Sequence, residues 1–327
     1  SHIEFANTII ENDSVNPTDC LNCFNGGGTG IGDFNNDGLS DIVFTGNQVS
    51  SALYLNKGSL VFEDISLEAN FKTDSWVTGV SIVDINADGL DDIYLNVAGV
   101  NCDNNCPNLL FINQGLNQNG IPTFIEQAEA YGLNDPNYAT QAVFFDYDMD
   151  DDLDIYIVHN KNSIKFNRNF PRPKDVWPDF LQDYLLKNET REGIDHPVFV
   201  NVSEELNIIH KGFGLGVGIT DFNDDQLIDI YVSNDFITED FLYINKAHHD
   251  SLNPGFEELN KKYLGHTTTN GMGMDIGDIN NDGLWDIFVL DMFPNSYYRQ
   301  KRVQGKMSYA EHMNTRNMGY SAQYMRN

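Results

Sequence analysis

The stretch DFNNDGLSD, from Asp33 to Asp41, places acids or amides at its first, third, fifth and ninth positions. The pattern recurs as DINADGLDD at 84–92, DYDMDDDLD at 146–154, DFNDDQLID at 221–229 and DINNDGLWD at 278–286. A short hydrophobic segment follows every copy. Five copies in register, at intervals of roughly 50 to 75 residues, indicate one structural unit used five times.

The alternation of side-chain oxygens within each copy is typical of a calcium loop. Calcium is a hard cation that takes about six to eight oxygen ligands, and a tight turn can bring alternate side chains onto one ion. Glycine at position six favours such a turn, although Asp151 and Gln226 replace it in the third and fourth copies. A polar turn without an ion is the alternative for one copy, and five copies in register disfavour it.

We expect ligands from the side chains at positions one, three, five and nine and from the backbone carbonyl near position seven, for about five calcium ions in all. The predicted ligands are Asp33, Asn35, Asp37, Leu39, Asp41, Asp84, Asn86, Asp88, Leu90, Asp92, Asp146, Asp148, Asp150, Asp152, Asp154, Asp221, Asn223, Asp225, Leu227, Asp229, Asp278, Asn280, Asp282, Leu284 and Asp286.

The composition of the chain agrees with a metal-binding role for its acids. The 327 residues carry a formal net charge of −30, which argues against nucleic acid as a partner because phosphate binding needs a basic surface. Twenty of the 49 acidic residues lie in the five loops. Without a cation these loops should repel themselves. No run of 18 apolar residues exists, so no transmembrane helix is predicted, and no signal peptide is visible.

Each repeat reads as four short strands, which predicts an all-β protein. One strand precedes each acidic loop, with glycine in every copy except the third, and a second strand follows the loop, while a third ends in asparagine and a fourth contains phenylalanine. Four-stranded units of this length favour a β-propeller, with the glycine-rich strand innermost, where the blades crowd the axis. The glycine run at 214–218 is no dinucleotide-binding motif, because a strand and an acidic loop follow it instead of a helix.

The acidic loops resemble FG-GAP or VCBS repeats. EFANTIIENDSVN, GDFNNDGLSDIVFTGN and GFGLGVGITDFNDD further resemble long exported VCBS-repeat surface proteins of Bacteroidota, which are similar to cartilage acidic proteins and associated with ASPIC/UnbV domains. This resemblance implies calcium-binding blades in a ring of seven, of which residues 1–327 form a single propeller domain from the N-terminal portion of a longer chain. The alternative is a five-bladed ring closed by the first residues of the chain, which would supply its last strand.

The resemblance also implies where the protein works. Related proteins are often lipoproteins at the outer-membrane surface, so we expect an extracellular location and a lipid anchor at a residue outside this sequence. Cys20, Cys23, Cys102 and Cys106 then suit disulfides in an exported protein. Local Cys20–Cys23 and Cys102–Cys106 bridges are favoured, while other pairings and a zinc site stay open.

Three long insertions, at 99–107, 159–181 and 291–321, are expected on the face opposite the calcium loops. Ten of the 19 basic residues fall in the second and third insertions, interleaved with aromatic residues. Such insertions on a rigid scaffold favour binding of a glycan or a protein, including an outer-membrane transporter complex. The alternative is that the insertions pack on one another and on later domains outside this sequence. The candidate partner-binding residues are Arg168, Arg172, Trp177, Asp235, Arg299 and Arg302.

The sequence therefore favours a calcium-stabilised binding or scaffold propeller at the cell surface. The alternative is a polysaccharide lyase or hydrolase acting on an anionic glycan, with candidate residues near strand ends on the insertion face: His159, His210, His266, Asp235 and Asp291. No spacing in the sequence assigns catalytic roles to these residues, so the catalytic residues remain unassigned.

Overall fold

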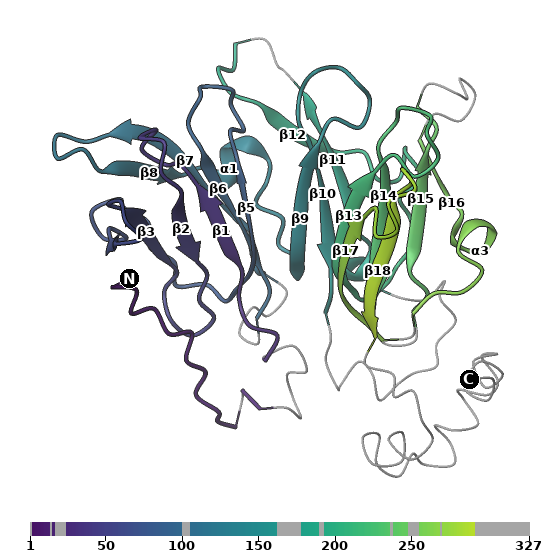
Figure 1. Ribbon diagram of the computed structural model, residues 1–327, viewed down its shortest axis with the longest axis horizontal. Coiled ribbons are helices and arrows are strands. Elements are labelled where there is room, and N and C mark those ends of the chain that lie inside the picture. Colours follow the sequence, from purple (N-terminus) through teal and green to yellow (C-terminus); the bar gives the residue numbers. More distant parts are fainter. Residues whose placement is uncertain are drawn as a thin grey trace.

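The structure is a computed structural model that describes residues 2–13, 15–16, 24–99, 105–161, 178–189, 193–235, 238–247, 255–268 and 270–291. Within these ranges the chain forms four antiparallel sheets of four strands and one sheet of two strands. The sheets stand side by side as the blades of a propeller (Figure 1). The prediction of an all-β, propeller-like fold built from four-stranded blades is confirmed.

The blades follow one another along the chain, and within each blade neighbouring strands are consecutive. The first blade contains β1 (Thr29–Gly32), β2 (Asp41–Phe44), β3 (Ala52–Asn56) and β4 (Phe62–Asp64). The second contains β5 (Val77–Val83), β6 (Asp92–Val97), β7 (Leu109–Leu116) and β8 (Pro122–Glu126), followed by α1 (Ala128–Tyr131). The third contains β9 (Ala139–Phe145), β10 (Asp154–His159), β11 (Tyr184–Glu189) and β12 (Val198–Asn201), with the 3-10 turn η2 (Asp179–Leu181) before β11.

The fourth blade contains β13 (Gly214–Thr220), β14 (Asp229–Asn234), β15 (Phe241–Asn245) and β16 (Phe256–Glu258), followed by α3 (Asn260–Tyr263). The fifth contains β17 (Gly271–Gly277) and β18 (Asp286–Asp291) within the described residues.

The first strands of neighbouring blades lie against one another, with β5 between β1 and β9 and β13 between β9 and β17. Their glycines make this approach possible. A Cβ atom added at Gly30 would lie 2.9 Å from Cδ1 of Ile82, and one added at Gly218 would lie 2.5 Å from Cδ1 of Ile276. Both distances are too short for a real side chain, so the glycines of the innermost strands are explained by close packing between blades.

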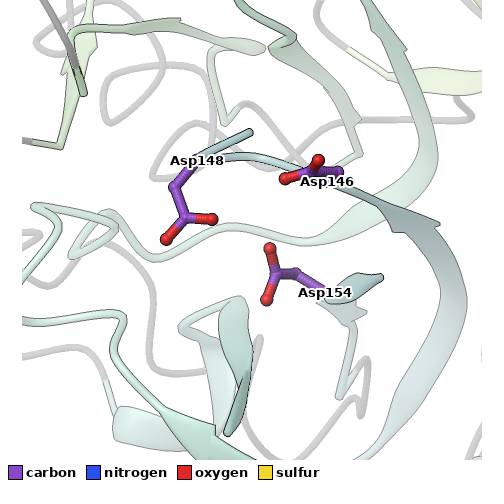
Figure 2. A group of neighbouring side chains, drawn as sticks. All are labelled: Asp146, Asp148 and Asp154. Carbon is purple, nitrogen blue, oxygen red and sulfur yellow. The ribbon is translucent and has the colours of Figure 1, made fainter. Parts of the chain in front are cut away.

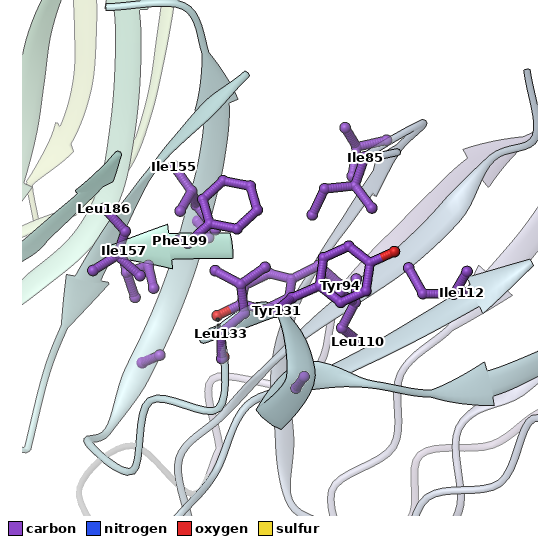
Figure 3. Packing of buried hydrophobic residues seen from close by; sticks show 14 residues of the cluster. Ile85, Tyr94, Leu110, Ile112, Tyr131, Leu133, Ile155, Ile157, Leu186 and Phe199 are labelled. Atoms are coloured by element: carbon purple, nitrogen blue, oxygen red, sulfur yellow. Dashed lines mark hydrogen bonds between the residues drawn. The ribbon is translucent and has the colours of Figure 1, made fainter. Parts of the chain in front are cut away.

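The hydrophobic core lies between the blades rather than inside any one of them. On β6, Ile93 packs toward the first blade and Tyr94 toward the third, because successive side chains of a strand point to opposite faces. Figure 3 shows the resulting cluster between the second and third blades, which contains Tyr94 and Leu110 from the second blade and Ile155 from the third. A strand buried on both faces needs an uninterrupted hydrophobic run, which explains the runs in β6, β10 and β14, whose residues are all buried.

The first residues of the chain pack on the outer face of the first blade and form no strand. The ring of Phe5 stacks on that of Phe44, with 5.4 Å between centroids, and Ile3 lies in the same cluster. The backbone N–H of Ile10 donates to Oε1 of Gln48 at 2.6 Å, and Nδ2 of Asn7 donates to Oδ1 of Asn47 at 2.6 Å. Side chains of the first blade therefore hold this segment, which differs from the closing strand considered as an alternative.

Two cavities mark the two faces of the blades. One, of about 340 Å³, lies beside the second acidic loop and is lined by Asp88 and by His196 from the connection between β11 and β12. The other, of about 450 Å³, is lined by Gln48 from the connection between β2 and β3, by Trp76 and by Pro107. The acidic loops thus share a face with the connections between third and fourth strands. Residues 100–104 and 162–177 of the first two predicted insertions, and all of the third after Asp291, lie outside the described residues.

Candidate calcium-binding loops

The five acidic loops share one backbone turn. Position six has a positive φ in every loop: 84° at Gly38, 85° at Gly89, 84° at Gly283, 68° at Asp151 and 72° at Gln226. The third and fourth loops therefore adopt the same turn without glycine, at a cost of about 1–2 kcal/mol for each left-handed residue. Residues at the same position of the five sequence copies therefore occupy the same position of the turn, as the sequence predicted.

The aspartate at position one holds this turn together. In the first loop Oδ1 of Asp33 accepts the backbone N–H of Asp37 at 3.0 Å, and Oδ2 accepts the N–H of Gly38 at 2.8 Å. Equivalent pairs of hydrogen bonds form at Asp84, Asp146, Asp221 and Asp278. Position one is therefore a turn-forming residue as well as a predicted calcium ligand.

The aspartate at position nine is buried and joins the loop to its blade. Asp41, Asp92, Asp154 and Asp229 are all fully buried. Burial raises the pKa of Asp41 and Asp229 to about 6 and that of Asp92 and Asp154 to about 7, although backbone hydrogen bonds oppose the shift. A cation nearby would favour the ionised form of such a carboxyl group.

A recurring asparagine at or near the end of the third strand ties neighbouring loops together. Nδ2 of Asn113 in the second blade donates to the carbonyl of Phe34 in the first loop at 3.0 Å. Nδ2 of Asn245 in the fourth blade donates likewise to the carbonyl of Tyr147 in the third loop at 2.8 Å. Its recurrence at strand ends was visible in the sequence, but the contact with the preceding blade was not, because it depends on how blades stack.

The donor atoms of the loops fit a hard divalent cation. In the third loop, carboxylate oxygens of Asp146, Asp148 and Asp154 lie within 4.8 Å of one another, and this acidic cluster could hold an ion. Figure 2 shows the three carboxylates facing a common space. In the other four loops position three is asparagine, which adds an amide oxygen in place of a carboxylate. Oxygen-only sets of this kind suit calcium.

His159 belongs to a buried ionic cluster. Its Nε2 lies 2.5 Å from Oδ2 of Asp135, and its Nδ1 lies 2.7 Å from the carbonyl oxygen of Gln182. Both partners are acceptors, so both ring nitrogens donate. Burial would lower the pKa of His159 and raise that of Asp135, but their mutual attraction outweighs burial and shifts each pKa the other way. The arrangement is that of a structural ion pair.

The remaining predicted site residues are dispersed. His210 packs beside Phe241, with 5.6 Å between ring centroids, His266 is exposed, and Asp235 is buried. Cys106 is buried, whereas Cys20, Cys23 and Cys102 lie outside the described residues, so the disulfide pairing stays a prediction. The candidate partner residues Arg168, Arg172, Trp177, Arg299 and Arg302 also lie outside them.

Comparison with known proteins gives the repeats a family. The FG-GAP-like repeat family matches residues 33–95 and 221–289. Cartilage acidic protein 1 of Mus musculus is 27% identical over 242 residues, which cover 72% of this chain and 32% of that protein. The Homo sapiens protein of the same name is also 27% identical, over 72% of this chain and 31% of its own length. The chain thus spans about a third of the length of the curated relatives it matches.

Across the part of the chain that the structure describes, no helix is long and apolar enough to span a bilayer. The shared acidic turns, the four-stranded blades and the matches to known repeats agree with one another. The chain contains FG-GAP-like repeats and is similar to cartilage acidic protein 1.

Proposed function

We propose that this protein is a calcium-stabilised propeller with a binding or scaffold role at the outer surface of the cell. The observation that carries the proposal is the common turn of the five loops, each of which presents the same pattern of oxygen donors. Each loop is proposed to hold one calcium ion, through the side chains at positions one, three, five and nine and the carbonyl at position seven. The ion would neutralise acids that otherwise repel one another.

Contacts between loops support a stabilising role for the ions. The backbone N–H of Asp33 donates to Oδ2 of Asp91 at 2.8 Å, and Nδ2 of Asn36 donates to the carbonyl of Gly89 at 3.0 Å. The first and second loops are therefore connected directly. An ion that binds only the folded loops stabilises the folded protein by mass action, and such contacts would spread its effect to the neighbouring blade.

Calcium titration tests this proposal. Protein freed of metal should melt at a lower temperature than protein in excess calcium, and equilibrium dialysis should show several ions bound per chain. Magnesium is the control cation, because it demands a smaller and more regular shell of ligands. A melting temperature that does not respond to calcium, together with no calcium bound on dialysis, would refute the role of the loops.

The binding surface is proposed to be the face opposite the loops. The cavity of about 450 Å³ there combines the indole of Trp76 with the amide side chains of Asn47 and Gln48. An aromatic face beside hydrogen-bonding amides suits a sugar ring. Farther along the chain, Nζ of Lys161 lies 4.1 Å from the ring centroid of Tyr138. These features support a glycan or a protein as the partner.

Two sets of variants test the choice of face. Replacing Arg168, Arg172, Arg299 and Arg302 together with serine should weaken binding of an anionic glycan and reduce its salt dependence. Trp76→Ala should weaken binding of neutral sugars on a glycan array. Both variants should keep the calcium-dependent melting of the parent. Unchanged binding by both, with binding lost when Asp195 and His196 are replaced on the loop face, would show that the face is wrong.

The cellular setting is part of the same proposal. Attachment to the outer-membrane surface through a lipid, and membership of a transporter complex, are supported by the resemblance to exported repeat proteins. Fractionation of cells that express the whole gene, followed by protease treatment of intact cells, tests exposure at the surface. Because His159 is enclosed in an ion pair, we do not propose lyase or hydrolase activity for it.

A further inference from the structure

The third acidic loop differs from the others at position three. Four loops have asparagine there, and its Nδ2 donates to the position-five aspartate: Asn35 to Asp37 at 3.0 Å, Asn86 to Asp88 at 3.0 Å, Asn223 to Asp225 at 2.9 Å and Asn280 to Asp282 at 3.0 Å. The amide links the two positions without adding charge. In the third loop position three is Asp148, whose ionised carboxylate has no hydrogen to donate.

Lys187 supplies the missing donor from another strand. Its Nζ contacts Oδ2 of Asp148 and lies 3.0 Å from Oδ2 of Asp150, so it joins positions three and five as the asparagine amide does elsewhere. The ammonium lies 5.6 Å from the ring centroid of Tyr147, and the side chain is 26% exposed. It is therefore held in place beside the loop rather than free in solvent.

The sequence position of Lys187 is unusual among the blades. It directly precedes Asn188, the asparagine at the third-strand end, where the other complete blades have Leu55, Ile112 and Ile244. Those three side chains are buried in apolar clusters between blades. The third repeat thus differs from the others at two positions. It has lysine before the third-strand asparagine, and it has aspartate in place of asparagine at position three of its loop. Both departures are visible in the sequence.

The location of the ammonium bears on metal binding. Asp148 belongs to the carboxylate group, with Asp146 and Asp154, that could hold an ion in this loop. Calcium bound by this group would share Asp148 with Lys187, and two cations on one carboxylate repel each other. Calcium must then bind either beside the ammonium, against its repulsion, or after the ammonium has been displaced from the carboxylate. Either case lowers the affinity of the loop for calcium.

We infer that Lys187 is a tethered counter-cation of the third loop, which bridges Asp148 and Asp150 in place of the asparagine amide and competes with calcium there. The third loop is consequently neutralised in part without metal and is the weakest of the five calcium sites. This inference rests on the proposed calcium binding by the loops. It makes residue 187 the determinant of how strongly the third loop depends on calcium.

Two variants and a matched control test the inference. Lys187→Leu places the residue of the first blade at this position. Asp148→Asn combined with Lys187→Leu rebuilds the arrangement of the other loops. Lys261→Leu removes a lysine that is 79% exposed and paired with Glu239 at 3.3 Å, far along the chain from the third loop. Thermal melting without metal and calcium binding by equilibrium dialysis are measured for all three and for the parent.

Without metal, Lys187→Leu should melt below the parent because Asp148 and Asp150 then repel each other, and the double variant should recover most of the loss. In calcium, the weakest site of the parent should tighten by about 10- to 100-fold in Lys187→Leu, while Lys261→Leu should bind as the parent does. If calcium binds the parent and Lys187→Leu with the same isotherm, the inference is wrong and the proposed calcium function stands. If none of the proteins binds calcium, both are wrong.

Discussion

Oδ1 of Asp41 accepts a hydrogen bond from the backbone N–H of Asn56 at 2.8 Å. The other carboxylate oxygen of Asp41 accepts the backbone N–H of Phe34 at 3.0 Å. One buried carboxylate thus fastens the acidic loop to the third strand of its own blade. The same pair of bonds forms at Asp92, Asp154 and Asp229, so position nine has a structural role in each complete blade, whether or not metal is bound.

Removal of this carboxylate should destabilise the protein even without calcium. Asp41→Ala leaves two buried N–H groups without an acceptor, so we expect the free energy of unfolding to fall by about 3 kcal/mol. Asp37→Ala, at position five, removes an exposed acceptor and should cost less than about 1 kcal/mol under the same conditions. Urea denaturation in metal-free buffer measures both. Equal losses would contradict the structural role of position nine.

Glycine at position six should stabilise the fourth loop. Gln226 has a φ of 72°, a conformation in which a Cβ atom is strained. Gln226→Gly relieves that strain, but glycine also gives the unfolded chain more conformational freedom, which offsets part of the gain. We expect the free energy of unfolding to rise by about 0.5–1 kcal/mol. Gln226→Ala is the control, because it keeps the Cβ atom and should give no gain. Denaturation in excess calcium is the measurement, and a loss of stability in Gln226→Gly would contradict the reasoning.

The stability contributed by the Asp135–His159 pair should depend on pH. The folded pKa of His159 is raised, so its contribution is complete below about 6.5, the usual pKa of histidine, and is lost as pH rises through the higher folded value. The folded pKa of Asp135 is lowered, so its contribution is lost as pH falls through that value. Asp183 also faces His159, and burial raises its pKa to about 6.

His159→Gln should therefore cost most in mildly acidic solution. We expect a loss of about 3 kcal/mol between roughly pH 5 and 6.5, because the variant leaves the Asp135 carboxylate buried without its cationic partner, and a smaller loss in strongly alkaline solution. Urea denaturation over a series of pH values measures the difference from the parent. His266→Gln, at an exposed position, is the control. A cost that does not vary with pH would contradict a charged pair.

The stabilisation by calcium should grow with pH. The folded pKa values of Asp92 and Asp154 are raised to about 7, well above the usual 3.8 for aspartate, so without metal these groups favour the folded state at low pH. That contribution is complete below about 3.8 and is lost as pH rises from there through about 7, and calcium restores it by pairing with the ionised carboxylates.

The increase in melting temperature on adding calcium to dialysed, metal-free protein should therefore be larger at about pH 8 than at about pH 5. Dialysed protein is preferable to a chelator, since chelators themselves titrate in this range. Magnesium at the same concentrations controls for ionic strength. A larger effect at the lower pH would contradict the assignment of position nine to the calcium sites.

The sequence by itself determined the repeat, its register and the geometry of each turn. The bonds from Asp33 to the backbone of residues 37 and 38 lie within six residues, so a pattern of nine letters contains all their participants. The same holds for the hydrophobic runs after the second, third and fourth loops, because alternate side chains of a strand buried on both faces meet the two neighbouring blades. Local periodicity was enough to predict four-stranded blades and an innermost glycine-rich strand.

Only the tertiary structure decided which residues of different strands meet. Lys187 reaches Asp148 across 39 positions of sequence, and His159 reaches Asp135 across 24. Such pairs depend on the register of β10 against β11 and on the stacking of one blade on the next, which no local pattern specifies. Charge on a side chain is visible in the sequence, but whether that charge lies in solvent, in an ion pair or against a metal-binding loop is decided by what the fold brings beside it.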